Sequence, residues 1–366
     1  MKKRHYLTQA SKWTSKFFWR ILTIIGGIGL FVLLISAFSD RVSPLTNSYI
    51  PFFGLFFPFI FVFNVLFLFF WLLFKKWKQA LVTLVVMAIC WGSIHAYFPI
   101  HGKTENVPED CIKFLTYNVM RFGDITQHTK EHPNPILQYV IEQDPDIVCF
   151  QEYLTVQKLT DEVIRQALKA TPYYYLGHPG LAIFSKYPIL SAEKIQMESQ
   201  FNGSFIAELN INGRTVTLIN NHLESNHLSP DDRSEYYSLT KEPDTQKLEA
   251  FTHLMYQRLT PSFKIRATQS KIISHVIREN KNPYIIVCGD FNDTPISYAR
   301  HTIKGDLTDS FVESGNGMGI SFNTNRFLFR IDYIFHSKNM KSYNCTVGKL
   351  KTSDHYPVWT YLQFKD

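Results

Sequence analysis

Polar side chains recur in this sequence where apolar, strand-like runs end. The runs concerned are "FLTYNV", "DIVCFQE", "TLINNHLES", "YIIVCGDFND", "RIDYIF" and "KTSDHYPVW". The side chains that stand out in them are Asn118, Glu152, His222, Asp290, Asn292, Asp332, Asp354 and His355. An isolated ionised carboxylate is costly to bury, and converging carboxylates repel one another unless a cation lies among them. Because oxygen ligands suit hard cations, the set predicts a site for Mg²⁺ or a similar ion.

Each of these motifs, taken singly, has an ordinary structural interpretation. A Gly-Asp pair after a strand is common, and a lone histidine is usually a hydrogen-bonded structural residue. Asp332 alone could simply pair with Arg330. Six such stretches in one order are poorly explained by six separate structural interpretations.

Their order and spacing resembles the endonuclease/exonuclease/phosphatase superfamily of metal-dependent phosphoesterases. "GDFN" and "SDHYP" are the most specific pieces, "QE" and "RIDYIF" support them, and the resemblance covers about residues 111–366. The superfamily includes deoxyribonucleases, abasic-site endonucleases, sphingomyelinases and inositol phosphatases. The resemblance therefore implies a hydrolase of phosphate esters that uses Mg²⁺ or Mn²⁺, and it favours a phosphodiesterase acting on a lipid head group or on nucleic acid.

The resemblance also implies which residues bind the metal. Glu152 would ligate it, Asn118 would lie beside it, and Asp354 would contribute directly or through water. A phosphodiester is anionic and repels hydroxide, so a cation at this position would offset the charge that develops at phosphorus.

The remaining residues are implied to act on water and on the phosphate. Asp290 would orient and deprotonate the attacking water, while Asn292 and His222 would hold phosphate oxygens. His355, oriented by Asp332, would stabilise charge on the phosphoryl group or assist proton transfer. All the motif residues are present, which argues against the alternative of a non-catalytic membrane receptor or scaffold that reuses the fold.

Alternating strands and helices in residues 111–366 are expected to position these side chains. Asn212-Gly213 is a strong hairpin signal, and the 266–280 segment has the spacing of an amphipathic helix. The other expected helices are 136–142 and 155–170, and the expected strands are 111–117, 146–152, "YYYL", "LAIFSKYPIL", "SFIAELNI", "RTVTLINNHL", 283–288, 327–336 and 357–364. This pattern predicts an α/β domain, a four-layer α-β-β-α sandwich of two mixed sheets.

Residues 1–100 are expected to anchor the chain in a membrane through three transmembrane helices, followed by a linker at 101–110. A bilayer span needs about 20 mostly apolar residues, and the candidate segments are 17–38, 49–74 and 79–98. Buried helices of a soluble protein and a cleavable signal peptide fit less well. The second segment could be re-entrant, because it contains Pro51 and Pro58.

The charges of the anchor predict its orientation. Residues 1–100 contain ten basic residues and one acidic residue, Asp40. Nine of the basic residues lie before or at the start of the first segment or in the 75–78 turn, which the positive-inside rule places in the cytoplasm. Three crossings would then put the catalytic domain outside. The net charge of +7 leaves about −2 for residues 101–366, so the basic excess gives no special support to a nucleic-acid groove.

Three smaller features complete the expectations. The five cysteines have no paired short spacing; Cys149 and Cys288 are expected as small buried residues, with a disulfide as the lesser alternative. The long connection 225–264 could be a substrate lid or a solvated helical insertion. Asp293, followed by Thr294-Pro295, is expected to cap a short helix.

Overall fold

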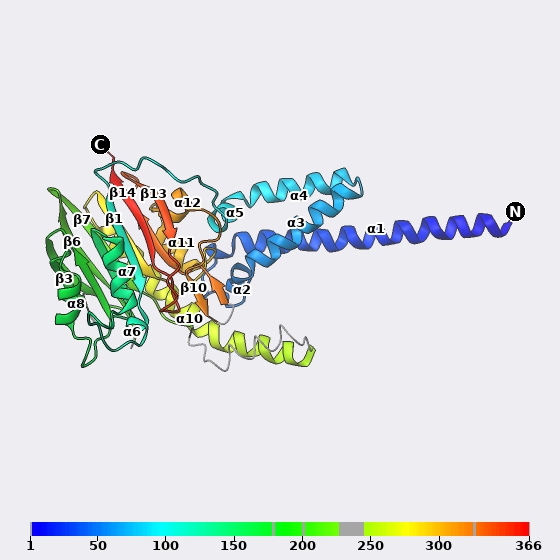
Figure 1. The fold of residues 1–366 in the computed structure, drawn as a ribbon. Coiled ribbons are helices and arrows are strands. Elements are labelled where there is room, and N and C mark those ends of the chain that lie inside the picture. The colour runs from blue at the N-terminus through cyan, green and yellow to red at the C-terminus, as the bar shows by residue number, and fades with distance from the viewer. Residues whose placement is uncertain (1, 178–179, 200–201, 227–244, 325–326, 366) are drawn as a thin grey trace.

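Two six-stranded mixed sheets form the centre of residues 111–366, the segment expected to be the catalytic domain (Figure 1). The computed structural model describes residues 2–365 apart from 178–179, 200–201, 227–244 and 325–326. The first sheet has the strand order β13 (Met340–Val347), β14 (Val358–Phe364), β1 (Ile112–Asn118), β2 (Ile147–Gln151), β4 (Leu181–Ser185) and β3 (Tyr173–Gly177). The second has the order β5 (Ile189–Ile195), β6 (Gly203–Ile211), β7 (Arg214–His222), β8 (Tyr284–Asp290), β12 (Asp332–His336) and β9 (Thr308–Asp309).

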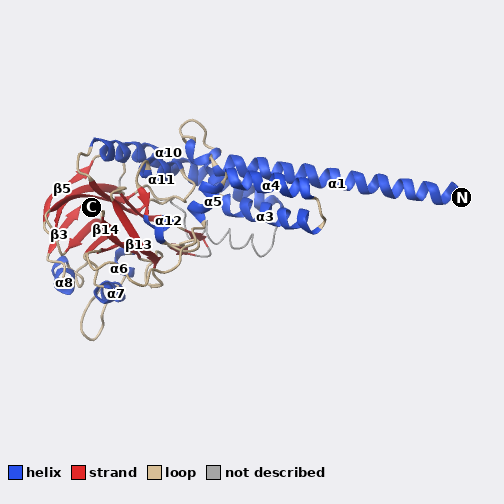
Figure 2. Ribbon diagram, turned by 90° about the horizontal axis from the view of Figure 1, so that it is seen from above, coloured by secondary structure: helices blue, strands red, loops and turns tan. Residues whose placement is uncertain are grey.

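Helices cover the outer face of each sheet. They are α6 (Met120–Gly123), α7 (Pro135–Gln143) and α8 (Asp161–Ala167) with the first sheet, and α10 (Thr245–Glu279) and α11 (Tyr298–Lys304) with the second. Helix α12 (Ser310–Ser314) packs against β13 and β12, and its Phe311 belongs to the cluster between the sheets. Figure 2 shows the strands as a layered core with α10 and α11 on one side and α7 and α8 on the other. A small two-stranded sheet, β10 (Phe322–Thr324) and β11 (Phe327–Phe329), lies beside them.

Three apolar clusters hold these four layers together. Between the sheets, Phe114 of β1 packs in the same cluster as Leu218 of β7. Ile136 of α7 belongs to the cluster on the outside of the first sheet, and Ile273 of α10 belongs to the one outside the second. Most residues of β2, β4, β7, β8 and β12 are buried, because one face of each sheet meets the other sheet and the opposite face meets a helix. The expected α-β-β-α sandwich is confirmed.

Several element boundaries differ from the sequence expectation. The run "LAIFSKYPIL" is divided between β4 and β5, which lie in different sheets. The expected strand 327–336 is two strands, β11 and β12, and the expected helix 155–170 shortens to α8. Strand β13 was not expected, because its sequence "MKSYNCTV" is mostly polar; it pairs with β14 at the sheet edge, where solvent tolerates polar side chains.

The long connection after β7 is largely helical in its described part. Helix α10 starts at Thr245, runs through Pro261 and ends at Glu279, so the expected helix 266–280 is its C-terminal half. Residues 227–244, which belong to the segment considered as a lid, lie outside the described residues. The hairpin at Asn212-Gly213 is confirmed by the continuous antiparallel pairing of β6 with β7.

The front of the chain forms a helical bundle that projects from the catalytic domain (Figure 1). Its elements are α1 (Lys2–Ala37), the short 3₁₀ helix η1 (Ser39–Arg41), α2 (Ile50–Leu55), α3 (Phe57–Leu73), α4 (Trp77–Ile89) and α5 (Trp91–Tyr97). We call residues 1–100 the anchor from here on, after the role expected from their sequence.

The expectation of three transmembrane helices needs correction. Among the described residues, one helix is long and apolar enough to cross a membrane, at Lys16–Arg41. Helices α4 and α5 are long and apolar enough to cross a membrane only if they are taken together, and they are bent by 69° at Cys90. The expected second span is broken at Phe56 into α2 and a 17-residue α3, and each of these has a proline in its first turn. A proline there lacks the N–H that would continue a preceding helix, which explains the break.

Candidate active site

The register of the strands brings the predicted residues to one edge of the sandwich. Strands β1 and β2 are parallel, with Asn118 paired with Gln151, so Glu152 follows directly beside Asn118. Strands β7 and β8 are also parallel, and His222 is paired with Asp290. Antiparallel β12 places its first residue, Asp332, opposite Asp290. The polar strand ends of both sheets therefore lie at the same edge of the sandwich.

A glycine makes the close approach of β7 and β8 possible. Gly289 has a φ of +122°, and a Cβ at this position would lie 2.0 Å from the backbone oxygen of Asn221. The Gly-Asp pair therefore has a physical cause, since only glycine fits the backbone just before Asp290.

We expect Gly289→Ala to lower the free energy of unfolding by roughly 3 kcal/mol, from the steric overlap with β7 and the left-handed backbone together. Gly213 is a matched control, because its φ is +83° but nothing lies within 4 Å of a Cβ built there. Gly213→Ala should cost roughly 1 kcal/mol, from backbone strain alone. Chemical denaturation of the two variants measures the difference, and equal losses would refute the role assigned to the overlap.

Asn118 connects the two carboxylates that lie nearest to it. Its Nδ2 donates to Glu152 Oε1 at 3.1 Å and to Asp290 Oδ2 at 3.0 Å, and its Oδ1 accepts from Met120 N. Glu152 itself has a φ of +51°, a conformation that is uncommon for a residue with a side chain. In this structure Asn118 thus orients two acids from different sheets.

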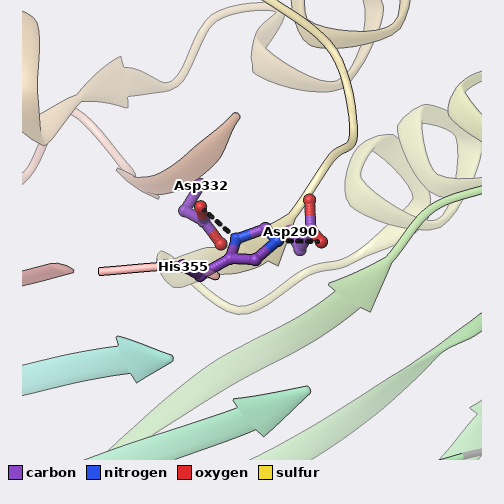
Figure 3. Close-up of side chains that lie close together, drawn as sticks. All are labelled: Asp290, Asp332 and His355. Atoms are coloured by element: carbon purple, nitrogen blue, oxygen red, sulfur yellow. Dashed lines mark hydrogen bonds and ion pairs between the residues drawn. The ribbon is translucent and has the colours of Figure 1, made fainter. Parts of the chain in front are cut away.

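His355 lies between Asp332 and Asp290 (Figure 3). Asp332 Oδ2 accepts a hydrogen bond from His355 Nδ1 at 2.9 Å, and His355 Nε2 lies 3.6 Å from Asp290 Oδ2. Ser353 fixes this loop, because its hydroxyl donates to the Asn118 backbone oxygen and accepts from the His355 backbone N–H. The imidazole is therefore held in one orientation, with Nε2 directed at Asp290.

His222 and Asn292 contact Asp290 from other sides. His222 Nε2 lies 3.6 Å from Asp290 Oδ2 and is buried without a hydrogen-bond partner. Asn292 donates from its backbone N–H to Asp290 Oδ1 at 2.8 Å, and its Nδ2 donates to Leu223 O and Asp290 Oδ2. The amide hydrogens of Asn292 are thus directed to the protein, which makes this residue a support for Asp290.

Burial and neighbouring charges shift the pKa values of these groups in opposite directions. Burial raises the pKa of Asp290 to about 6, against the nearby imidazoles of His355 and His222. Burial alone would lower the pKa of His355, but the carboxylates of Asp332 and Asp290 raise it to about 10. Burial lowers the pKa of His222. At neutral pH His355 is therefore cationic and His222 neutral.

The donor set fits a divalent cation. Glu152 and Asp354 both line the cavity above the site, and Asp354 Oδ1 is buried without a partner. A buried carboxylate oxygen without a partner, at a cavity that a second carboxylate also lines, is the kind of group that a hard cation stabilises. The three groups that lie closest together are Asp290, Asp332 and His355. His355 is already hydrogen-bonded to Asp332 there, so Glu152 and Asp354 are the better candidates for ligands.

Asp293 does not have its expected role. The N-cap of α11 is Ser297, whose side chain accepts from Arg300 N, whereas Asp293 forms an ion pair of 3.2 Å with the fully buried Arg266 of α10. Burial of a guanidinium demands an anionic partner, so the carboxylate is used there. Asp332, in contrast, pairs with His355 as the resemblance implied, and the alternative partner Arg330 donates to the backbone oxygen of Ala96.

Two supporting residues of the site were not predicted. Ser353 precedes the Asp354-His355 pair, and Ser321 Oγ accepts from the backbone N–H groups of Ile331 and Asp332. The "SDH" sequence contained the first of these, but a serine in a loop is too common to be singled out. Ser321 lies 11 residues before Asp332 and carried no sequence signal.

The cysteines are as expected from their positions. All five are free, and Cys149 and Cys288 are fully buried in the cluster between the sheets. The alternative of a disulfide is not supported.

Residues 115–355 match the family model described as "Endonuclease/Exonuclease/phosphatase family". The chain belongs to that family. The matched range contains all eight residues of the site, and members of the family depend on a divalent metal. Residues 16–97, within the anchor, match a second family model, "Domain of unknown function (DUF8431)".

Solved structures with a similar fold come from several organisms. An endonuclease/exonuclease/phosphatase from Bacteroides vulgatus is 15% identical over 70% of this chain and 99% of that one, with a TM-score of 0.47. TDP2 from D. rerio, complexed with a single-strand DNA product, is 16% identical over 69% and 99%, with a TM-score of 0.47. Beta toxin from Staphylococcus aureus is 18% identical over 68% and 99%, with a TM-score of 0.44. No curated protein matches the sequence significantly.

Proposed function

We propose that this chain is a membrane-anchored, divalent-metal-dependent phosphodiesterase whose catalytic domain lies outside the cytoplasm. The observation that carries the proposal is the buried array in which Asp290 contacts Asn118, His222 and His355, while Asp332 holds His355 from behind. Titratable groups whose pKa values are shifted in opposite directions at one cavity are typical of catalytic sites.

The chain's own groups suit the hydrolysis of a phosphodiester. Asp290 holds the attacking water and accepts its proton, because Asn118 and Asn292 fix its carboxylate in one orientation. His222 can donate from its unpartnered Nε2 to a phosphate oxygen. His355 offsets negative charge on the phosphoryl group. Mg²⁺ or Mn²⁺, held by Glu152 and Asp354 with Asn118 beside them, would supply further charge stabilisation when bound.

Metal removal should abolish the activity. Excess chelator is expected to stop hydrolysis of bis(p-nitrophenyl) phosphate by the full chain, and added Mg²⁺ or Mn²⁺ should restore it. Glu152→Gln should raise the metal concentration needed for half activation by roughly tenfold or more, with the thermal stability of the chelated protein unchanged. Hydrolysis that continues in excess chelator would show that the proposed metal-dependent chemistry is wrong.

A non-catalytic receptor remains the second candidate from another functional class. Replacement of a motif residue would favour a receptor, but all the motif residues are present in this chain. Failure of the purified chain to hydrolyse any phosphodiester in the presence of Mg²⁺ would favour the receptor.

Basic residues of the anchor support its membrane role and orientation. The turn between α3 and α4 carries Lys75 and Lys76, Lys78 follows in the first turn of α4, and Lys76 Nζ lies 4.1 Å from the centre of the Trp19 ring. Trp19 adjoins Arg20 in α1, so the last residue of the first basic cluster lies near the α3–α4 turn, at the end of α3 and α4 away from the catalytic domain (Figure 1). Between Arg20 and Ala37, α1 is roughly 26 Å long at 1.5 Å per residue, close to the thickness of the apolar core of a bilayer.

The basic end should face the cytoplasm and the catalytic domain should lie on the opposite side. A reporter fused after Asp366 in a bacterial host tests this. Alkaline phosphatase, which is active only after export, should be active in the fusion, and green fluorescent protein should stay dark. The reverse result would place the catalytic domain in the cytoplasm and return cytosolic nucleotides to consideration as substrates.

A further inference from the structure

The catalytic residues open into a large cavity that the anchor helps to form. The cavity has a volume of about 1770 Å³, well above the roughly 300–1,000 Å³ of ordinary ligand pockets. At one end it is lined by Glu152, Asp290, Asn292, Asp354 and His355. At the other end it is lined by α2, the start of α3 and the first half of α10, so one space joins the site to the anchor.

The outer part of this cavity, which we call the anchor groove, has mostly apolar walls. Its lining includes Phe52, Phe56 and Phe59 from the anchor, Met255 and Leu259 from α10, and Leu328 from β11. Among the described residues, no lysine or arginine lines the cavity, and the titratable groups of the α10 wall are Glu249, His253 and Tyr256. A nucleic acid needs basic side chains along its phosphates, whereas a hydrocarbon chain needs this kind of wall.

The anchor groove is a built part of the molecule. Tyr256 of α10 stacks on Tyr49 and Phe52 of the anchor, with ring centres 4.9 and 5.8 Å apart, and its hydroxyl is hydrogen-bonded to Ser48 Oγ. Gly54 of α2 packs so closely on the segment after β8 that a Cβ there would lie 2.1 Å from Ile296 O. The anchor wall is therefore fixed directly against the loop that carries Asn292.

Two aromatic residues of the anchor groove are exposed where the helical bundle meets the catalytic domain. Phe56 and Phe59 are 51% and 64% exposed, and they lie where α2 passes into α3, at the domain end of the bundle. Exposed aromatic residues beside a cavity of this kind mark a route for apolar ligands. Helix α10 projects from the catalytic domain in the same direction as the bundle (Figure 1).

We infer that the substrate is an amphiphilic phosphate ester, with its phosphate at Asp290 and His355 and its hydrocarbon chain in the anchor groove. This inference rests on the proposed function and adds the substrate class to it. The anchor then serves as one wall of the substrate site as well as a tether. A chain emerging between α3 and α10 could remain partly in the bilayer while its phosphate reaches the catalytic residues.

The test compares two phosphodiesters that share one reacting centre. Methyl p-nitrophenyl phosphate and hexadecyl p-nitrophenyl phosphate release the same leaving group, and only the second has a chain to place in the anchor groove. With the full chain in one nonionic detergent and Mg²⁺, kcat/KM for the hexadecyl ester should exceed that for the methyl ester by roughly a hundredfold, since burial of a few methylene groups suffices.

A matched pair of double variants then probes the anchor groove. Phe56→Gln with Leu328→Gln changes residues that are 51% and 46% exposed inside it, one from the anchor and one from the catalytic domain. Leu45→Gln with Leu190→Gln changes residues that are 50% and 56% exposed outside it. The first pair should lower the hexadecyl-to-methyl ratio by roughly tenfold, the loss expected for about two methylene contacts. The second pair should leave the ratio unchanged.

Binding in excess chelator separates this inference from the proposed function. Affinity for the hexadecyl ester, measured without turnover, should fall in the Phe56/Leu328 variant and stay constant in the Leu45/Leu190 variant. If neither ester is hydrolysed, the proposed function fails, and the binding result alone decides whether the anchor groove holds a chain. Equal kcat/KM for the two esters would overturn the inference. So would a single-stranded oligonucleotide that is cleaved faster than either ester, and at the same rate by the wild type and the Phe56/Leu328 variant.

Discussion

Asp290→Asn is expected to lower kcat by roughly a thousandfold, the range found when a general base is lost. The amide has the shape of the carboxylate and keeps an oxygen for the Asn292 backbone N–H, which now bonds Asp290 Oδ1 at 2.8 Å. It cannot accept a proton from water at neutral pH. Steady-state hydrolysis of bis(p-nitrophenyl) phosphate at saturating Mg²⁺ measures the loss.

A second buried acid provides the control for this variant. Asp309 forms an ion pair of 2.6 Å with Arg300 and caps α12, and it lies outside the array around Asp290. Asp309→Asn should lower the melting temperature but leave kcat unchanged, because it weakens a buried ion pair away from the chemistry. Retention of wild-type kcat in Asp290→Asn would show that another group activates the water.

His355→Ala and Asp332→Asn are each expected to lower kcat/KM by roughly a hundredfold or more. Asp332 acts through the 2.9 Å hydrogen bond to His355 Nδ1, so it has little to contribute once the imidazole is gone. The double variant should therefore be only slightly slower than His355→Ala alone, and a double-mutant cycle measures this coupling.

Strict additivity of the two losses would mean that Asp332 and His355 act separately. The comparison needs folded proteins, since Asp332 is buried opposite Asp290 in the strand register. Melting temperatures of the three variants provide that check. Asn retains the shape of Asp332, so a large drop in stability for Asp332→Asn would point to a structural role as well.

The residues of the site could be predicted because strand ends are visible in a sequence. Asp290 and His222 each close an apolar run, and the carboxyl ends of parallel strands meet at one edge of a sheet. Their pairing across β7 and β8 could not be predicted, because register depends on contacts between distant segments. The contacts of Asn292 could not be predicted for the same reason. Its side-chain amide donates to Asp290 and Leu223 rather than pointing to solvent.

Asp293 shows how a long-range partner overrides a local rule. An aspartate before Thr-Pro has the pattern of a helix cap, but Arg266 lies 27 residues earlier and is buried beside it. Nothing local in either segment shows that α10 brings this guanidinium to the loop after β8. A buried guanidinium without a counter-ion would cost more free energy than a helix cap contributes.

The anchor shows a limit of hydropathy alone. Residues 49–74 have the composition of one continuous span, but the chain turns at Phe56 so that α2 packs on the catalytic domain. Gly54 allows that contact, since any larger side chain would overlap the Ile296 backbone. Average hydrophobicity contains no information about such a packing contact, although the two prolines indicated that the segment was irregular.

The fate of the attacking water tests the central claim most directly. The full chain is incubated with bis(p-nitrophenyl) phosphate and Mg²⁺ in water enriched in heavy oxygen, and the products are analysed by mass spectrometry. If Asp290 activates water for attack on phosphorus, one heavy oxygen should appear in the phosphate product and none in the nitrophenol. Unlabelled phosphate product, label in the nitrophenol, or the same labelled yield from Asp290→Asn would contradict the account.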